Sequence, residues 1–308
     1  MDALKPRCVI LTGPTGVGKS ELALRIAEQF SGEIISADSR QIFRRLDIGT
    51  AKPAPAQLAA IPHHQIDTHD PRESYSAGVY ARDTLPIIRR VYEQGNLPLV
   101  TGGSGFYIEA LIHPLYTGDS ATNAQRDEIG QQYSKLNNEE LHSALSHIDP
   151  EAAAGIEFND RRKLLRYLEI HRLEGRPPSD VFSESSDAPP LDYTLLVLFD
   201  EREQLYQRIN QRVDQMIEAG LIEEVRQLLD SGSNPADNAM LSVGYREIVA
   251  HLQGELSQEE AVALIQKNSR NYAKRQLTWF RRWPEAEWIH YDQRDTVFEL
   301  VSDIWGRR

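Results

Sequence analysis

The chain of 308 residues contains a single cysteine and no apolar run long enough to cross a membrane. Cys8 has no partner within the chain, which excludes an internal disulfide and fits a reducing compartment. The first apolar run, at residues 8–11, is also too short for the core of a signal peptide. We therefore expect a cytoplasmic protein that does not enter a membrane, and we expect it to act as a monomer.

Basic residues are in the minority. The sequence has 34 lysines and arginines against 46 aspartates and glutamates, which gives a net charge of −12. This balance argues against a protein that coats nucleic acid nonspecifically, but it is compatible with a local basic surface. Hydrophobic residues make up 40% of the chain, enough for a sizeable core in one or two domains.

A glycine-rich segment near the amino terminus has the sequence GPTGVGKS, at residues 13–20. It follows the apolar run 8–11 directly and precedes a helical pattern at 21–30, and a strand, loop and helix in this order form a phosphate cradle. We expect its glycines to turn the backbone amides inward, Lys19 to reach terminal phosphates and the Ser20 hydroxyl to ligate Mg²⁺. The predicted phosphate-binding residues are Gly13, Pro14, Thr15, Gly16, Val17, Gly18, Lys19 and Ser20.

Apolar runs of strand length occur in both halves of the chain. The runs at 9–11, 34–37 and 97–101 alternate with helical patterns, which predicts a parallel sheet covered by helices. A fourth run, 193–199, returns the chain to the same sheet and is followed by a helical pattern at 203–231.

From about residue 117 to 190 the strand signals vanish, and helical segments such as 161–173 replace them. We interpret residues 117–190 as an inserted helical domain. The predicted fold class is therefore α/β, with a P-loop NTPase-like parallel sheet core made of residues 1–116 and 191–308.

Two features are expected at the edge of the sheet that faces the ligand. Asp38 follows the run 34–37, where it could accept a proton from an attacking hydroxyl or amine, or simply cap a turn. The run 97–101 lacks the terminal aspartate with which many nucleotide hydrolases hold Mg²⁺, which disfavours hydrolysis-driven switching. It leads instead into a glycine-rich turn, 101–105, which is either a simple tight turn or a second source of polar groups, including the Ser104 hydroxyl.

A helical pattern at 257–283 carries an unusual concentration of positive charge, because residues 261–284 include no acid. Its basic residues are Lys267, Arg270, Lys274, Arg275, Arg281 and Arg282. At about 100° per residue they fall on one arc. The opposite side holds Tyr272, Trp279, Phe280 and Trp283, which we expect in the core. The arc could be a solvated face, but its uniform sign predicts contacts with RNA or DNA phosphates. A second basic cluster lies in the insertion, at Arg161, Arg162, Lys163 and Arg166.

The segment 63–70 contains three histidines and two aspartates and superficially resembles a metal site. Its spacing matches no zinc motif. We therefore interpret these histidines as structural.

Several motifs extend over nearly the whole chain. They are GPTGVGKS at 13–20, DSRQIFRRLDIGTAKP at 38–53, HHQID at 63–67, DPRESYS at 70–76, PLVTGGSGFYIEAL at 98–111, NDRRKLLRYLEI at 159–170, RVDQMIEAGLIEEV at 212–225, VGYREI at 243–248 and AKRQLTWFRR at 273–282. In combination they closely resemble the bacterial tRNA dimethylallyltransferases, which prenylate an adenosine beside the anticodon. The segments DIGTAKP and KRQLTWFRR are highly specific for this family.

The resemblance implies that the P-loop holds the pyrophosphate of dimethylallyl diphosphate rather than a nucleoside triphosphate. It also implies that Asp38 is the general base and that Arg212 contacts the diphosphate. Ser104 stands where the family usually has threonine, which keeps a hydroxyl near the reacting exocyclic amine. The implied catalytic residues are thus Asp38, Ser104 and Arg212, with Mg²⁺ as the cofactor.

The resemblance further implies contacts with the tRNA anticodon loop, from which the target base must be flipped. These residues are Ser39, Arg40, Gln41, Arg126, Arg162, Lys163, Leu164, Leu165, Arg166, Val243, Gly244, Tyr245, Arg246, Lys274, Arg275, Gln276, Leu277, Thr278, Trp279, Phe280 and Arg281. The chain departs from the family at Glu157 and Phe158, where His-Pro is commoner, and at Arg161 and Lys163, where proline and arginine are.

Three other functions use the same residues. A small-molecule or nucleotide kinase would need the P-loop and Asp38 but no RNA. A transferase acting on free adenine nucleotides would leave the basic helix without a role. A nucleotide-switched RNA-binding regulator would form no covalent product.

Overall fold

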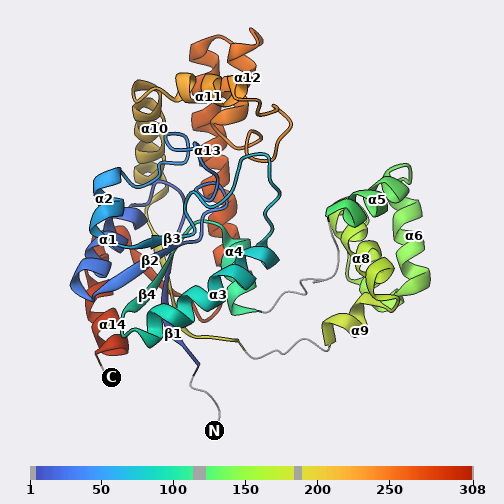
Figure 1. The fold of residues 1–308 in the computed structure, drawn as a ribbon, viewed down its shortest axis with the longest axis horizontal. Helices are drawn as coiled ribbons and strands as arrows, with labels where there is room; N and C mark the ends of the chain where they lie inside the picture. Colours follow the sequence, from blue (N-terminus) through green and yellow to red (C-terminus); the bar gives the residue numbers. More distant parts are fainter. Residues whose placement is uncertain (1–4, 114–122, 184–188, 307–308) are drawn as a thin grey trace. The chain divides into compact units, whose positions relative to one another are not determined.

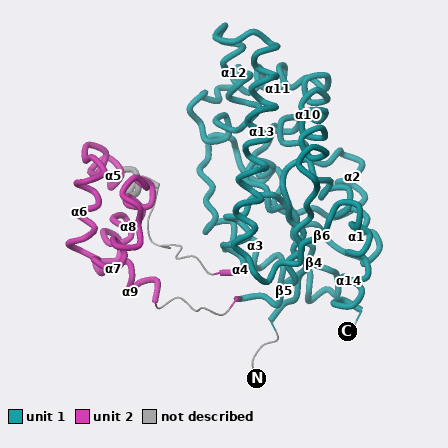
Figure 2. The backbone as a smooth tube through the Cα atoms, turned by 180° about the vertical axis from the view of Figure 1, so that it is seen from behind, with its two compact units in different colours: residues 1–112, 190–308 teal, residues 113–189 magenta. Residues whose placement is uncertain are grey.

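The computed structural model describes residues 5–113, 123–183 and 189–306. The chain divides into two compact units, one of residues 1–112 with 190–308 and one of residues 113–189 (Figure 2). The expected domain boundary at residue 116 lies outside the described residues.

The larger unit is built on a six-stranded sheet with the strand order β3-β2-β4-β1-β5-β6. Strands β1 to β4 are labelled in Figure 1. The strands are β1 (Arg7–Thr12), β2 (Gly32–Ser36), β3 (His63–His64), β4 (Leu97–Gly102), β5 (Asp192–Phe199) and β6 (Glu287–His290). Every neighbouring pair is parallel, and Val9 of β1 is aligned with Leu99 on one side and Thr194 on the other. The predicted α/β class and parallel sheet are confirmed. The edge strands β3 and β6 were not predicted.

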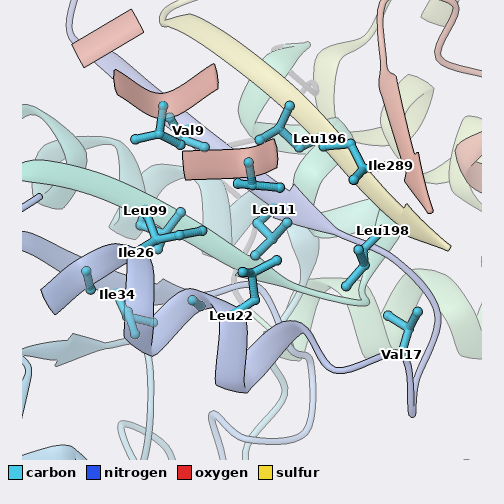
Figure 3. Close-up of a cluster of buried hydrophobic side chains, with 14 of the residues drawn as sticks. Val9, Leu11, Val17, Leu22, Ile26, Ile34, Leu99, Leu196, Leu198 and Ile289 are labelled. Carbon is cyan, nitrogen blue, oxygen red and sulfur yellow. The ribbon is translucent and has the colours of Figure 1, made fainter. Parts of the chain in front are cut away.

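The core lies on both faces of this sheet. Val9 and Leu11 of β1 pack in one cluster with Leu22 and Ile26 of α1 (Lys19–Gln29) (Figure 3). Because successive strand residues point to opposite faces, Cys8 and the other intervening residues of β1 face away from this cluster, and they are equally buried. Burial on both faces explains why the central strands are continuous apolar runs.

Two further helices of the first half contact the sheet or follow it. They are α3 (Ala77–Glu93), which contacts β1, β2 and β4, and α4 (Gly105–Ile112), which packs on α3. The short helix α2 (Pro55–Ala60) precedes β3.

The second half of the larger unit is mainly helical. Its elements are α10 (Arg202–Glu218), α11 (Leu221–Asp230), α12 (Tyr245–Leu252), α13 (Gln258–Phe280), a 3₁₀ turn η1 (Tyr291–Gln293) and α14 (Thr296–Trp305). The pattern at 203–231 is two helices rather than one, because Gly220 between them has φ 100°, a left-handed conformation that glycine adopts without a Cβ clash. In the described part of the chain, no helix has both the length and the apolar character that a bilayer span requires.

The smaller unit consists of helices in its described residues. They are α5 (Asn123–Ser134), α6 (Asn138–Ile148), α7 (Pro150–Ala154), α8 (Arg161–Glu174) and α9 (Pro178–Ser183). Leu141 and Leu145 of α6 form its core with Leu164 and Leu168 of α8.

Arg161 has a structural role in this unit. Its guanidinium donates to the carbonyl oxygens of Tyr133, Ser134 and Leu136, at 3.3, 3.1 and 2.7 Å. The carbonyls of Tyr133 and Ser134 lie at the end of α5, where the regular intrahelical donors are missing, and Leu136 lies just beyond the helix. Arg161 therefore caps α5, whereas its neighbours Arg162 and Lys163 are exposed.

Candidate phosphate-binding and catalytic site

The P-loop, residues 13–20, connects β1 to α1 and passes close to β5. A Cβ on Gly13 would lie 2.3 Å from the carbonyl oxygen of Leu198, so only glycine allows this approach. Gly18 has φ 94° at the start of α1, again in the left-handed region. The strand, loop and helix predicted from the motif are all present.

Lys19 lies folded over the P-loop. Its Nζ donates to the carbonyl oxygens of Gly13 at 2.9 Å and Pro14 at 2.8 Å. Burial, and secondarily the positive charge of Arg212, lower the pKa of Lys19 to about 7, while the charge of Asp38 acts in the opposite direction. These three charged groups therefore share one electrostatic environment.

Asp38 follows β2 with its carboxylate fixed by the backbone. Oδ1 accepts from the amides of Arg40 at 2.8 Å and Gln41 at 3.4 Å. Among the described residues, both of its hydrogen bonds use Oδ1, which leaves Oδ2 available to a ligand. Asp38 thus holds a turn with one oxygen, and the other could accept a proton from a substrate.

The glycine-rich turn after β4 is tied to the residues that follow β2. The Ser104 hydroxyl oxygen accepts from the Ser39 amide at 2.9 Å, and the Ser104 amide donates to Ala37 O at 3.0 Å. Ser104 also hydrogen-bonds to the Tyr272 phenol, whose pKa is raised to about 12, mainly by burial. The turn is therefore more than a chain reversal, because it brings Ser104 and Tyr272 beside Asp38.

Gln276 on α13 joins the P-loop to the same turn. Its Oε1 accepts from the Thr15 amide at 2.9 Å, and its Nε2 donates to Gly103 O at 2.7 Å. The side chain is buried. Gln276 was expected to contact RNA, but both ends of its amide are engaged within the protein.

Two arginines of α10 approach the P-loop. Arg212 donates to Thr15 Oγ1 and to Thr50 O, each at 3.4 Å, and burial lowers its pKa. Arg208, one helical turn earlier, donates from Nε to Gly16 O at 3.2 Å and forms an ion pair with Asp200. Arg208 was missed in the sequence, although its spacing of four residues from Arg212 places both on one helix face.

Two cavities meet at Asp38. The first, about 430 Å³, which we call the phosphate cavity, is lined by Lys19, Ser20, Arg208 and other residues around the P-loop. The second, about 360 Å³, which we call the acceptor cavity, is lined by residues of several segments. They include Ser39 and Arg40 after β2, Gly49 and Thr50, Ile209 and Met216 on α10, Val243 to Tyr245, and Ser269 and Arg275 on α13. Both cavities are lined by Thr15, Asp38, Arg212 and Tyr272. Tyr272 was expected in the core, but it stands at this junction.

The residues expected to contact RNA have different surroundings. Ser39, Arg40, Val243, Gly244, Tyr245 and Arg275 line the acceptor cavity, whereas Gln41 lines the phosphate cavity. The exposed members of the set are Arg162, Lys163, Arg246, Lys274, Thr278 and Arg281. The half-buried members are Leu165, Arg166, Leu277 and Trp279. Arg126 lies in α5, and its side chain is outside the described residues.

Besides Gln276, three of the expected RNA contacts need correction. They are Leu164, Tyr245 and Phe280, which have no exposed surface. Their positions in the motifs reflect helix packing. Arg270 was predicted on the exposed basic arc. It is half-buried, and its Nη1 donates to Asn210 Oδ1 on α10 at 2.6 Å.

The histidines after α2 are structural in their contacts. His64 Nε2 lies 2.6 Å from Glu33 Oε2, and His63 Nδ1 lies 2.7 Å from Ile61 O. Nowhere in the described ranges do three His, Cys, Asp or Glu side chains gather as a metal site. Ser20 is exposed in the phosphate cavity at the start of α1, so its hydroxyl fits a metal whose other ligands are phosphate oxygens.

A P-loop on a parallel sheet, two arginines and an oriented carboxylate between two cavities define an α/β protein built to bind a phosphorylated compound beside a second substrate. The family model for IPP transferase matches residues 41–283. The chain belongs to the IPP transferase family.

Known proteins resemble the chain over almost its full length. The tRNA dimethylallyltransferase of Pelotomaculum thermopropionicum is 44% identical over 300 residues, which cover 97% of this chain and 96% of that protein. The crystal structure of the full-length tRNA isopentenylpyrophosphate transferase from Bacillus halodurans matches with a TM-score of 0.73 and 37% identity, covering 98% of both chains. A eukaryotic dimethylallyltransferase acting on tRNA matches with a TM-score of 0.86 and 27% identity, covering 98% of this chain and 80% of the other.

The bridge made by Gln276 gives a testable prediction. A Cβ on Gly103 would lie 2.2 Å from Gln276 Nε2, so Gly103→Ala must displace the amide. We expect this variant to lose about 1–3 kcal/mol in the free energy of unfolding, as overpacking usually costs. We also expect faster hydrogen exchange of the Thr15 amide, which Gln276 protects.

The control is Gly130→Ala in α5, where a Cβ meets nothing within 4 Å. It should change stability by less than about 1 kcal/mol. Equal stability and equal Thr15 exchange in Gly103→Ala and the parent would show that the bridge is not needed.

Proposed function

We propose that this protein is a tRNA dimethylallyltransferase. It transfers the dimethylallyl group of dimethylallyl diphosphate to the exocyclic amine of the adenosine on the 3′ side of the anticodon and releases pyrophosphate. The observation that carries this proposal is the position of Asp38, which lines both the phosphate cavity and the acceptor cavity. Family membership and the names of the relatives support it.

The phosphate cavity has the charges that a departing pyrophosphate needs. Lys19, Arg208 and Arg212 surround it and would bind the diphosphate oxygens as negative charge develops on them. Ser20 would hold Mg²⁺ together with those oxygens, and the metal would supply further charge neutralisation. The P-loop thus serves as a diphosphate site.

The acceptor cavity provides the groups for the amine. As the N–C bond forms and the C–O bond to the diphosphate breaks, the amine loses a proton, which Asp38 Oδ2 accepts. The Ser104 hydroxyl, fixed by the Ser39 amide, would position the amine. Asp38 and Ser104 would thus both act on the amine during the same displacement reaction.

RNA binding is assigned to exposed cations. In the larger unit these are Lys274 on α13 and Arg281 directly after it, and in the smaller unit Arg162 and Lys163 on α8. Phosphate contacts of this kind would offset the cost of unstacking the target base. A tRNA substrate supports a cytoplasmic location, and a monomer remains our prediction.

The decisive experiment is mass spectrometry of an unmodified tRNA incubated with the protein, Mg²⁺ and dimethylallyl diphosphate, without nucleoside triphosphate. We expect a gain of one five-carbon prenyl group at the adenosine next to the anticodon. Asp38→Asn should lower the transfer rate at least about a hundredfold, the usual contribution of a general base, with little change in either substrate affinity.

No mass gain, together with consumption of ATP when small acceptors are supplied, would favour the kinase instead. Losses of substrate affinity as large as the loss of rate in Asp38→Asn would show that this residue binds rather than catalyses.

The lowered pKa of Lys19 predicts a pH dependence of diphosphate affinity. The free side chain titrates at about 7, and a bound anion favours its ammonium form, so binding above that pH takes up a proton. The Kd for dimethylallyl diphosphate, measured by calorimetry, should therefore rise with pH from 7 to 9, by up to about tenfold per unit.

Lys19→Arg is the control, because a guanidinium stays charged over this range. Its Kd should change with pH only as the ionisation of the ligand dictates. Identical pH profiles for the two proteins would contradict this role of Lys19.

The exposed basic residues on α13 and directly after it give a further prediction, which concerns RNA affinity. Lys274→Glu with Arg281→Glu should raise the Kd for tRNA about tenfold or more and reduce its salt dependence, because phosphate contacts are lost. The Kd for dimethylallyl diphosphate should not change.

The matched control is Arg89→Glu with Arg90→Glu, the same charge change on an exposed part of α3. Similar tRNA affinities for the two double variants, measured by filter binding at several salt concentrations, would exclude α13 as the RNA surface.

A further inference from the structure

One carboxylate outside both cavities holds a loop that lines the acceptor cavity. Glu224 lies in the first turn of α11 and accepts four hydrogen bonds. Oε2 accepts from the amides of Asp47 at 3.0 Å and Ile48 at 2.7 Å, and Oε1 accepts from the Gly49 amide at 3.1 Å and from the Tyr245 phenol at 2.7 Å. Three consecutive backbone amides thus converge on one side chain.

Tyr245 supports the same loop from its other side. Its ring is fully buried, and a Cβ on Gly49 would lie 2.5 Å from a ring carbon. Burial and the neighbouring charge of Glu224 keep the phenol pKa far above its ordinary value, so the hydroxyl stays a donor. The backbone at 47–49 is therefore fixed between the ring and the carboxylate.

The next residue connects this loop to the catalytic groups. Thr50 O accepts from Arg212 Nη2 at 3.4 Å and from Gln41 Nε2 at 3.3 Å. The backbone amide of Gln41 donates to Asp38 Oδ1 at 3.4 Å. Any displacement of Thr50 therefore reaches the arginine assigned to the diphosphate and the turn that orients the base.

We propose that Glu224 is a positioning residue for prenyl transfer. It lines neither cavity, and it acts through the loop 47–50 by holding the Thr50 carbonyl where Arg212 is directed at the diphosphate. This inference rests on the function proposed above. It assigns to the sequence LIEEV a role in binding the leaving group, carried by the second of its two glutamates.

The test compares Glu224→Gln with Glu223→Gln. The same chemical change is made at adjacent positions, but Glu223 is exposed and faces Arg226, 3.3 Å away, instead of the loop. Glutamine at 224 replaces one acceptor oxygen by an NH₂ group, which places a donor against donors from the loop. The parent protein is measured beside both variants under the same conditions.

Two readouts are needed. The first is the Kd for inorganic pyrophosphate with Mg²⁺, measured by calorimetry, which requires no transfer activity. We expect it to rise about fivefold to tenfold in Glu224→Gln and to stay at the parent value in Glu223→Gln. The second is steady-state transfer to tRNA, in which the KM for dimethylallyl diphosphate should rise by a similar factor while the KM for tRNA changes little.

This pattern separates positioning from general damage to the fold. A loss of folded protein lowers the apparent kcat and leaves both KM values and the Kd unchanged, and that outcome would overturn the proposal. If Glu224→Gln is poorly folded, Tyr245→Phe provides the second test, because it removes one of the four hydrogen bonds and leaves the ring in place. It should raise the pyrophosphate Kd in the same direction by a smaller factor, and an unchanged Kd would again overturn the proposal.

A double-mutant cycle tests whether Glu224 acts through Arg212. In an Arg212→Ala background, Glu224→Gln should add little to the loss of pyrophosphate affinity, because the group through which it acts is gone. Fully additive losses would contradict the route through Arg212. If the parent and Glu223→Gln bind pyrophosphate but do not modify tRNA, the proposed function fails, while the pyrophosphate Kd of Glu224→Gln still decides the role of this residue.

Discussion

The hydrogen bonds of the Gln276 amide hold the site together, because they join the loops that follow two neighbouring strands of the sheet. The P-loop follows β1 and the glycine-rich turn follows β4, and one side chain of α13 bonds to both. From that turn, Ser104 reaches the residues after β2, where Asp38 is oriented. Phosphate cradle, hydroxyl and carboxylate are thus positioned by a continuous series of short contacts rather than by the strands separately.

The parts of the fold that follow from local physics were predicted correctly. The buried strands are continuous apolar runs because both of their faces are covered, and the P-loop follows from glycines at fixed spacing before a lysine and a serine. The edge strands β3 and β6 are two and four residues long, too short for a periodic pattern. The break at Gly220 was overlooked because amphipathic patterns continue on both sides of it, although a glycine at this point is a signal for the end of a helix.

The residues that surround Asp38 required the folded chain. Tyr272 and Glu224 act through partners far away in the sequence, and no spacing rule connects them to those partners. Arg208 shares a helix face with Arg212, but its contact with Gly16 is visible only in the folded chain. Helical periodicity placed Tyr272 on the apolar side of α13, and the phenol does lie inward, but toward the cavities instead of the core. Motif matching included Leu164 and Phe280 among RNA contacts because motifs record packing residues and binding residues together.

The folded position of Lys19 has a consequence for ligand selection. The Lys19 ammonium group already donates to two carbonyl oxygens. An anionic ligand must therefore replace these two hydrogen bonds with contacts to its own negative oxygens. A singly charged anion offers little more than the carbonyls do, whereas adjacent phosphate groups offer several negative oxygens at once. Under the proposed function, the loop would discriminate by charge density, and inorganic ions of low charge would be poor competitors for the cradle.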